Sequence, residues 1–122
     1  MIAEQVAGVH HVALIVDDLD AAYNFYENVL GFKALPRPDF GFDGKWYEVG
    51  GQQIHIFPGE TAAGRHHLAL QVTDLEAVAT TLEAAGVPVR RSMYFPGAGH
   101  QVFIKDPAGN RIELNEPDHL TP

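Results

Sequence analysis

Two histidine pairs, each at the start of an apolar stretch, are the first feature of this sequence that could do chemistry. The segment VHHVALIVDDL, residues 9–19, returns 56 positions later as RHHLALQVTDL, residues 65–75, with seven of the eleven residues identical. Each apolar stretch has the length and composition of a β-strand, and Asp18 or Asp74 follows it. Because a repeated sequence indicates a repeated structural unit, the two histidine pairs are expected to occupy equivalent places in the fold.

Alternation along a strand predicts which histidine of each pair faces which side. Successive side chains of a strand point to opposite faces, so His11 lies on the face opposite the most apolar side chains of its strand. His67 repeats this placement in the second copy. The helix must cover the more apolar face, so His11 and His67 are expected to point away from it, and His10 and His66 to face it or to bond to backbone.

The last strand of each copy carries a second repeated polar position. GGQQIHIF and AGNRIELN align at an offset of 58, which places Gly51 with Gly109 and His55 with Glu113. This offset is two larger than that of the first strands, which fits a slightly different loop in the second copy. An even shift leaves the strand phase unchanged, so His55 and Glu113 are expected to be equivalent.

The two polar positions of each copy together give four candidate metal ligands: His11, His55, His67 and Glu113. Imidazole nitrogens and a carboxylate oxygen are donors that Fe(II), Ni(II), Co(II), Mn(II) and Zn(II) accept, and two histidines with one carboxylate form an open catalytic arrangement. Without a metal, three inward imidazoles beside a carboxylate would carry a large desolvation penalty. The sequence therefore predicts a divalent metal site, with a hydrogen-bonded polar core as the alternative. For His55 the alternatives to direct coordination are a hydrogen bond to one of the ligands or an acid–base role.

The elements that must position these residues follow in the same order in both copies. Apolar residues recur at helical spacing over 19–30 and begin the same series over 75–82. An aspartate that can act as an N-cap precedes each helix, and a glycine suited to positive φ follows it. These residues are Asp18 and Gly31 in the first copy, and Asp74 and Gly86 in the second.

Three short β-type runs follow each predicted helix. They are FKALP, KWYEVG and QQIHIF in the first copy, and VPVRRSMYF, HQVFIKD and NRIELNE in the second. The GG at 50–51 and the DPAGN at 106–110 are typical of hairpin turns. Each copy is thus expected to fold as β-α-β-β-β. We expect one domain, 1–122, made of a module 8–57, a linker 58–65 and a module 66–116.

Composition limits the classes of partner. The 16 acidic residues against 8 basic ones give a formal net charge of −8, which disfavours binding to nucleic acid and to anionic membranes. The sequence has no cysteine, no signal-peptide pattern and no apolar run long enough to span a membrane. A cytoplasmic protein with a small-molecule substrate is the expectation.

The motifs HHVALIVDDL, FYENVLGF, HHLALQVTDL and DPAGNRIEL resemble the vicinal oxygen chelate superfamily over about residues 8–116. This superfamily includes glyoxalase I, extradiol dioxygenases and bleomycin-resistance proteins. The resemblance implies an α+β fold, the glyoxalase/bleomycin-resistance/dioxygenase fold, in which two tandem βαβββ modules curl their sheets around a metal site. It also implies a homodimer.

Carried over residue by residue, the resemblance implies the same ligand set. The family's first-strand histidine corresponds to His11, its fifth-strand histidine to His67 and its C-terminal carboxylate to Glu113. The fourth position is Glu in typical glyoxalase I and Gln in typical epimerases, whereas here it is His55. Extradiol enzymes have an acid–base histidine in this neighbourhood, so His55 is either a ligand or a proton carrier.

The function expected from the resemblance is metal-dependent glyoxalase I-like lyase or isomerase chemistry on a small oxygen-chelating substrate, with Glu113 as the base. One alternative is an Fe(II) extradiol-type dioxygenase in which His55 moves protons. The other is a noncatalytic, bleomycin-resistance-like protein that binds a drug or metabolite. Arg37 and Arg91 could clamp a substrate anion or be solvated surface charges, and FPGAG, residues 95–99, could form a flap near the site.

Overall fold

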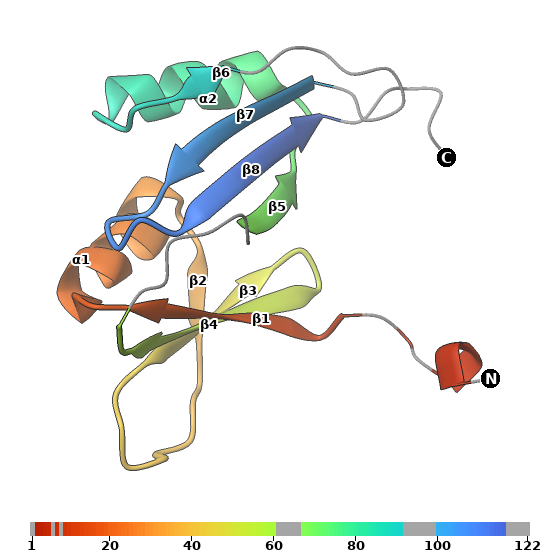
Figure 1. The fold of residues 1–122 in the computed structure, drawn as a ribbon, viewed down its shortest axis with the longest axis vertical. Coiled ribbons are helices and arrows are strands. Elements are labelled where there is room, and N and C mark those ends of the chain that lie inside the picture. The colour runs from red at the N-terminus through yellow and green to blue at the C-terminus, as the bar shows by residue number, and fades with distance from the viewer. Residues whose placement is uncertain (1, 6, 8, 61–66, 92–99, 117–122) are drawn as a thin grey trace. The chain divides into compact units, whose positions relative to one another are not determined.

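The computed structural model describes residues 2–5, 7, 9–60, 67–91 and 100–116 of the chain (Figure 1). The chain consists of two compact units, Met1–Glu60 and Thr61–Pro122. The linker residues 61–65, His66 and the expected flap 95–99 lie outside the described residues. No described helix is both long and apolar enough to cross a membrane.

The first unit is one mixed sheet with a helical segment on it. After the short helix η1 (Ile2–Gln5), its elements are β1 (His11–Val16), α1 (Leu19–Tyr23), η2 (Asn24–Val29), β2 (Lys33–Leu35), β3 (Lys45–Val49) and β4 (Gln52–Pro58). The strand order is β1-β4-β3-β2, with β1 and β4 parallel and the other neighbours antiparallel. The first and last strands of the unit therefore lie side by side.

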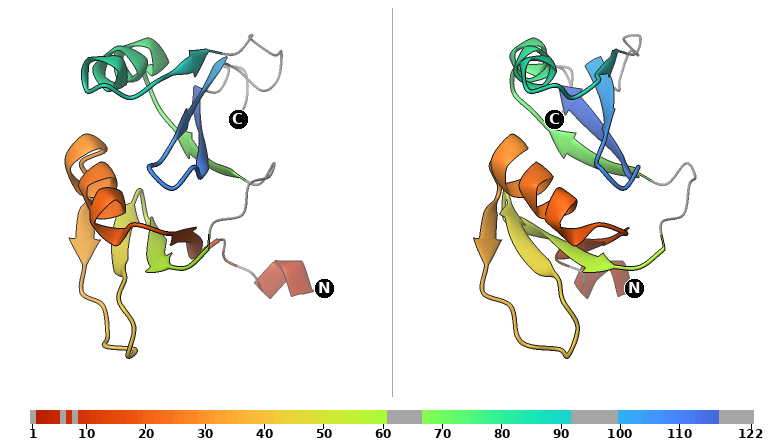
Figure 2. Two further views of the ribbon diagram at one scale, coloured as in Figure 1. Left: turned by 60° about the vertical axis from the view of Figure 1, so that its left-hand side comes forward. Right: turned by 90° about the vertical axis from the view of Figure 1, so that its left-hand side faces the viewer.

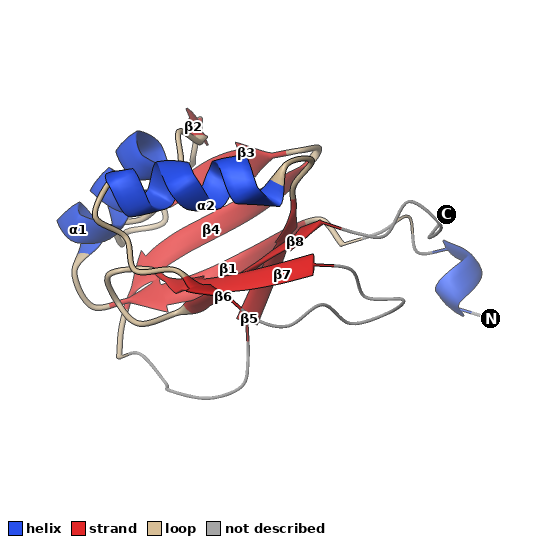
Figure 3. Ribbon diagram, turned by 90° about the horizontal axis from the view of Figure 1, so that it is seen from above, coloured by secondary structure: helices blue, strands red, loops and turns tan. Residues whose placement is uncertain are grey.

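The second unit repeats this topology. Its elements are β5 (His67–Gln71), α2 (Leu75–Ala84), β6 (Arg90–Arg91), β7 (His100–Lys105) and β8 (Arg111–Glu116). The strand order is β5-β8-β7-β6, and β5 pairs with β8 in parallel (Figure 2). The tandem βαβββ architecture, an α+β fold, is confirmed; Figure 3 distinguishes its helices and strands by colour.

One face of each sheet is apolar and carries the helix. On β4, Ile54 and Ile56 are 2% and 1% exposed, and α1 packs on this strand. On β8, Ile112 and Leu114 are 0% and 2% exposed, and α2 packs on β7 and β8. Alternate residues of both strands are less buried, as period-two side-chain alternation requires.

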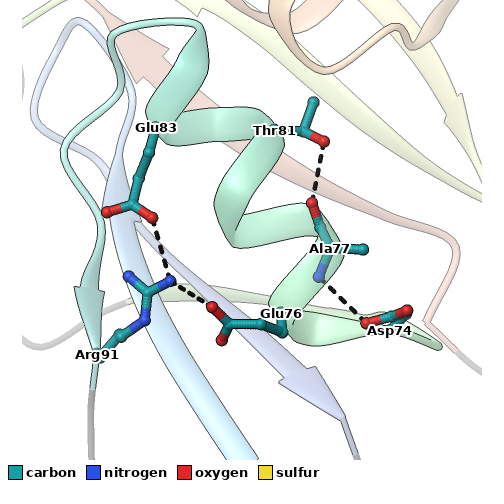
Figure 4. A network of polar contacts seen from close by, with 6 residues as sticks. All are labelled: Asp74, Glu76, Ala77, Thr81, Glu83 and Arg91. Carbon is teal, nitrogen blue, oxygen red and sulfur yellow. Dashed lines mark hydrogen bonds and ion pairs between the residues drawn. The ribbon is translucent and has the colours of Figure 1, made fainter.

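The helix ends are built as the sequence predicts. Oδ1 of Asp18 accepts the backbone N–H of Ala21, and Oδ1 of Asp74 accepts that of Ala77 (Figure 4). Each bond satisfies a donor that the first turn of a helix leaves without a partner. Gly86 follows α2 at a φ of 84°, a conformation in which a side chain would be strained.

The first helix differs from the continuous α-helix expected over 19–30. It is α-helical to Tyr23 and continues as a π-helix, η2, in which the N–H of Leu30 reaches the carbonyl of Phe25 at 2.9 Å. Two consecutive rings are buried in this wider turn: Phe25 is 5% exposed and Tyr26 is 0% exposed. The helical spacing of apolar residues in the sequence places Tyr26 on the buried face of the predicted helix but does not place Phe25 there.

A polar contact joins η2 to β3. Glu27 Oε2 accepts hydrogen bonds from Lys45 Nζ at 2.7 Å and from the fully buried Tyr47 hydroxyl at 2.9 Å. The bond from Lys45 is the main reason that the pKa of the Glu27 carboxyl lies below its usual 4.5, and the bond from Tyr47 adds to the effect. Burial raises the pKa of Tyr47, so this hydroxyl stays a donor.

Replacing Glu27 by Gln is expected to lower the free energy of unfolding at pH 7 by about 1 kcal/mol. Because the folded-state pKa is depressed, this stabilisation is present above pH 4.5 and is lost as the pH falls through the folded-state pKa. Urea unfolding of both proteins between pH 7 and pH 3 would show the two stabilities converging in acid. Glu48→Gln, an exposed change on β3, the strand that carries Lys45 and Tyr47, is the control. A constant difference at all pH values would contradict the prediction.

Candidate metal-binding site

The four predicted ligands occupy equivalent register positions in the two sheets. On the β1–β4 pair, His55 lies opposite Ala13, and His11 is two residues earlier on β1. On the β5–β8 pair, Glu113 lies opposite Ala69, and His67 is two residues earlier on β5. Residues 56 apart on the first strands and residues 58 apart on the last strands therefore occupy the same register positions in the two sheets.

The strand faces follow the alternation predicted for the histidines. His11 and His67 begin β1 and β5 on the exposed side, while Val16 and Leu68 on the opposite side of these strands are buried. His10 corrects the expectation of a helix-facing or backbone-bonded side chain. It precedes β1, is exposed, and its Nδ1 lies 2.9 Å from Nδ1 of His11. The side-chain alternation of a strand does not apply to His10, because β1 begins at His11.

His55 stands in the middle of a stack of three rings in the first unit. The imidazole of His11 lies on it at a centroid distance of 3.9 Å and an interplanar angle of 11°. The indole of Trp46 lies on it at 4.4 Å, also at 11°. β4 runs between β1 and β3, so His11 and Trp46 cover opposite faces of the His55 ring. The stack fixes the ring plane.

The protonation state of His55 suits coordination. Its Nε2 lies 2.8 Å from Oε1 of Gln53, an oxygen that can only accept, so Nε2 carries a proton in this contact. Burial, followed by the neighbouring His11, His10 and Arg37, lowers the pKa of His55 to about 4. The ring is therefore neutral at pH 7, which is the form that binds a metal. Gln53 was not identified from the sequence, although it precedes His55 by two residues on the same face.

The second unit holds an imidazole–carboxylate pair. His67 Nε2 lies 3.3 Å from Oε1 of Glu113, and Glu113 Oε2 accepts a hydrogen bond from Asn115 Nδ2 at 3.2 Å. The side chain of Glu113 is 13% exposed and that of His67 is 38% exposed. Phe103, opposite Glu113 on β7, meets the His67 ring edge-to-face. The pair is thus mostly sheltered but open on the histidine side.

The structure brings His11 together with His55, and His67 together with Glu113, one pair in each unit. Within the described ranges, no group of three or more His, Asp or Glu side chains meets the geometry of a metal site. The donor types fit a borderline divalent ion, since three imidazoles and one carboxylate are its common ligands. The four-residue site therefore stays a prediction, supported by the two pairs.

A cavity of about 240 Å³ lies beside the ring stack in the first unit. His11, His55 and Trp46 line it, together with Arg37, Phe40 and Phe42 from the segment between β2 and β3. Phe40 and Phe42 were not identified as pocket residues from the sequence. The sequence did contain a signal for them. The two phenylalanines flank Gly41 in a segment with no strand pattern, where large apolar side chains are not expected to be part of a core.

Close backbone contact holds the segment that carries these two phenylalanines. A Cβ placed on Gly44 would lie 2.5 Å from the carbonyl oxygen of Ile56 on β4, so only glycine fits there. The guanidinium of Arg37 lies over the rings of Phe40 and Phe42, 5.0 and 5.1 Å from their centroids. Its Nη1 also donates to the carbonyl of Phe42 at 3.1 Å. Arg37 is thus a pocket residue.

Arg91 has the other role that the sequence left open, that of a solvated surface charge. Its Nη2 bridges Glu76 at 2.9 Å and Glu83 at 3.1 Å on the exposed side of α2 (Figure 4). Exposed ion pairs of this kind contribute little to stability. Arg37 and Arg91, which had the same two possible roles in the sequence, therefore differ in the structure: Arg37 lines the cavity and Arg91 pairs with surface carboxylates.

Comparison with known proteins agrees with the repeat and the topology. A family model for the Glyoxalase/Bleomycin resistance protein/Dioxygenase superfamily matches residues 8–114. The chain belongs to this superfamily. Members of the superfamily act on small molecules and commonly use divalent metals.

Individual relatives are named as a glyoxylase or as a lactoylglutathione lyase. The chain is 30% identical over 128 residues to Glyoxylase I 4 of Arabidopsis thaliana, covering 94% of this chain and 74% of the relative. It is 31% identical over 123 residues to lactoylglutathione lyase of Haemophilus influenzae, covering 87% and 90%. The crystal structure of a glyoxalase-family protein from Bacillus anthracis aligns with a TM-score of 0.83 at 27% identity, covering 93% of this chain and 97% of that one.

Proposed function

We propose that this superfamily member is a divalent-metal-dependent enzyme with glyoxalase I-like lyase or isomerase chemistry on a small oxygen-chelating substrate. The observation that carries the proposal is the donor pair at the same register position of each sheet, His11 with His55 and His67 with Glu113. The similarity to lactoylglutathione lyases, at about 31% identity, supports the choice of reaction. The proposal includes a cytoplasmic homodimer.

In this proposal the four donors bind one ion, which would be Fe, Ni, Mn, Co or Zn. A divalent ion held there would supply Lewis-acid stabilisation of negative charge on two adjacent substrate oxygens. Three neutral imidazoles leave most of the positive charge of the ion uncompensated, and Glu113 supplies the anionic donor. The low pKa of His55 keeps its imidazole neutral at neutral pH, so one ring nitrogen has a lone pair free to bind the ion.

Glu113 is proposed to have a second role as the general base. Its carboxylate would take the proton from the carbon next to a substrate carbonyl and return it to the neighbouring carbon. Asn115 donates to Oε2 and so holds one oxygen, while Oε1 faces His67. A carboxylate fixed in this way keeps its direction through the proton transfer.

Two alternatives predict different outcomes of the same assays. An extradiol-type dioxygenase would cleave a catechol ring with Fe(II) and O₂, and His55 would then carry protons. A noncatalytic binding protein would bind a small molecule without turnover, although retention of four donors argues against it. Formation of an S-lactoyl thioester from a hemithioacetal would support the glyoxalase-like reaction.

Metal analysis tests the site itself. We expect purified protein reconstituted with Ni(II), Zn(II), Mn(II), Co(II) or Fe(II) to retain one ion per predicted site after buffer exchange. His11→Ala and His67→Ala each remove one donor and are expected to lower metal affinity by at least about tenfold. His100→Ala, an exposed change at the start of β7, should leave metal content unchanged. Retention of metal by both site variants would contradict the proposal.

A further inference from the structure

We infer that the cavity beside the His11–His55 pair binds a planar aromatic carboxylate as part of the substrate. The inference rests on the proposed function in that His11 and His55, two proposed ligands, line this same cavity. It goes further by naming the substrate class, which the donor set alone leaves open.

The aromatic lining favours a flat ring. Trp46, Phe40 and Phe42 form a connected set, with Phe40 5.9 Å from both of the other rings. Phe40 and Phe42 are 51% and 53% exposed, so two large apolar rings face an open cavity. Aromatic rings gain most from covering such surfaces, because offset and edge contacts add to the burial of apolar area.

The cavity is large enough for a six-membered ring with a substituent. Its volume is about 240 Å³. An apolar cavity of about 150 Å³ can already hold benzene. A small aromatic ligand therefore fits, with room left for polar groups near His11 and His55.

The charge beside the rings favours an anion. Arg37 is the lining residue with a permanent positive charge. Among the described residues Arg37 makes no ion pair with a carboxylate; its contacts are the Phe42 carbonyl and the faces of Phe40 and Phe42. A guanidinium with free donor capacity at the edge of an aromatic cavity is suited to a carboxylate on the ring.

Binding of probes to the metal-free protein tests this inference separately from the metal site. Trp46 is the single tryptophan of the chain, so its fluorescence reports on this cavity. Benzoate carries a planar ring and a charge, cyclohexanecarboxylate carries the charge on a non-planar ring, and benzamide carries the ring without the charge. We expect benzoate to bind about twofold to tenfold more tightly than cyclohexanecarboxylate.

Variants separate the ring from the charge. Phe40→Leu and Phe42→Leu keep apolar bulk and are expected to abolish the preference for benzoate over cyclohexanecarboxylate. Arg37→Gln is expected to lower the preference for benzoate over benzamide by about tenfold, a ratio that is measured within one protein and is insensitive to general loosening of the segment. Val9→Ala, an exposed apolar change outside the cavity, should preserve both preferences.

The outcomes distinguish this inference from the proposed function. Equal binding of benzoate and cyclohexanecarboxylate, or no change in Trp46 fluorescence with either, would overturn the inference even if the protein binds metal and is active. Loss of the proposed function would instead show as absence of bound metal, with ring-selective binding intact.

Discussion

Glu113→Gln is expected to lower kcat/KM for a hemithioacetal substrate by about two to four orders of magnitude, the usual contribution of a general base. The amide has the size of the carboxyl but can neither take the proton nor supply the anionic donor. Fold and stability should persist, because the buried neighbours Ile112 and Leu114 point to the opposite face of β8. The rate of thioester formation with metal-loaded protein measures the effect.

A matched change on another strand controls for the loss of one negative charge. Glu48→Gln alters an exposed carboxylate on β3 and should leave kcat/KM within about twofold, since a screened surface charge acts weakly at a distance. If Glu113→Gln retained more than a third of wild-type activity, Glu113 would be neither base nor ligand.

Asp106→Ala is expected to lower the free energy of unfolding by about 2–4 kcal/mol, the largest loss of stability we predict for a single polar residue. The Asp106 side chain is 4% exposed and organises the β7–β8 turn. Its Oδ1 accepts the backbone N–H groups of Ala108 and Asn110, and its Oδ2 accepts the side-chain amide of Asn110. Alanine would leave these partly buried donors without the Asp106 carboxylate as their acceptor. Urea unfolding at pH 7 measures the loss.

A second aspartate in a turn provides the comparison. Asp39 is exposed and accepts a single backbone hydrogen bond, from Gly41 at 2.9 Å. Asp39→Ala should therefore cost under about 1 kcal/mol. Equal effects of the two substitutions would mean that burial at Asp106 adds nothing.

The sequence predicted the frame of each unit because that frame follows from local, periodic physics. Alternation fixed the exposed face of His11 and His67, and the two offsets placed His55 and Glu113 at equivalent pairing positions, as the register confirms. Asp18 and the other capping residues were also predicted correctly, since an N-cap bond involves residues only three apart.

The features that were missed depend on contacts between distant segments. The π-helix arises where Phe25 and Tyr26 are both buried, which helical periodicity alone does not encode. The cavity lining depends on how the segment with Phe40 and Phe42 approaches β4, a close approach set by Gly44. The ring order around His55 requires the strand order β1-β4-β3, which no single segment reveals.

The shared pairing scheme also bears on how such a protein can evolve. The position held by His55 in one sheet is held by Glu113 in the other, and each is flanked by buried aliphatic residues that face the opposite way. Selection can therefore exchange the group at either position while the apolar side, and with it foldability, is left untouched. The repeated module thus offers one such position in each sheet, His55 in the first and Glu113 in the second, at which a new side chain could change the reactivity.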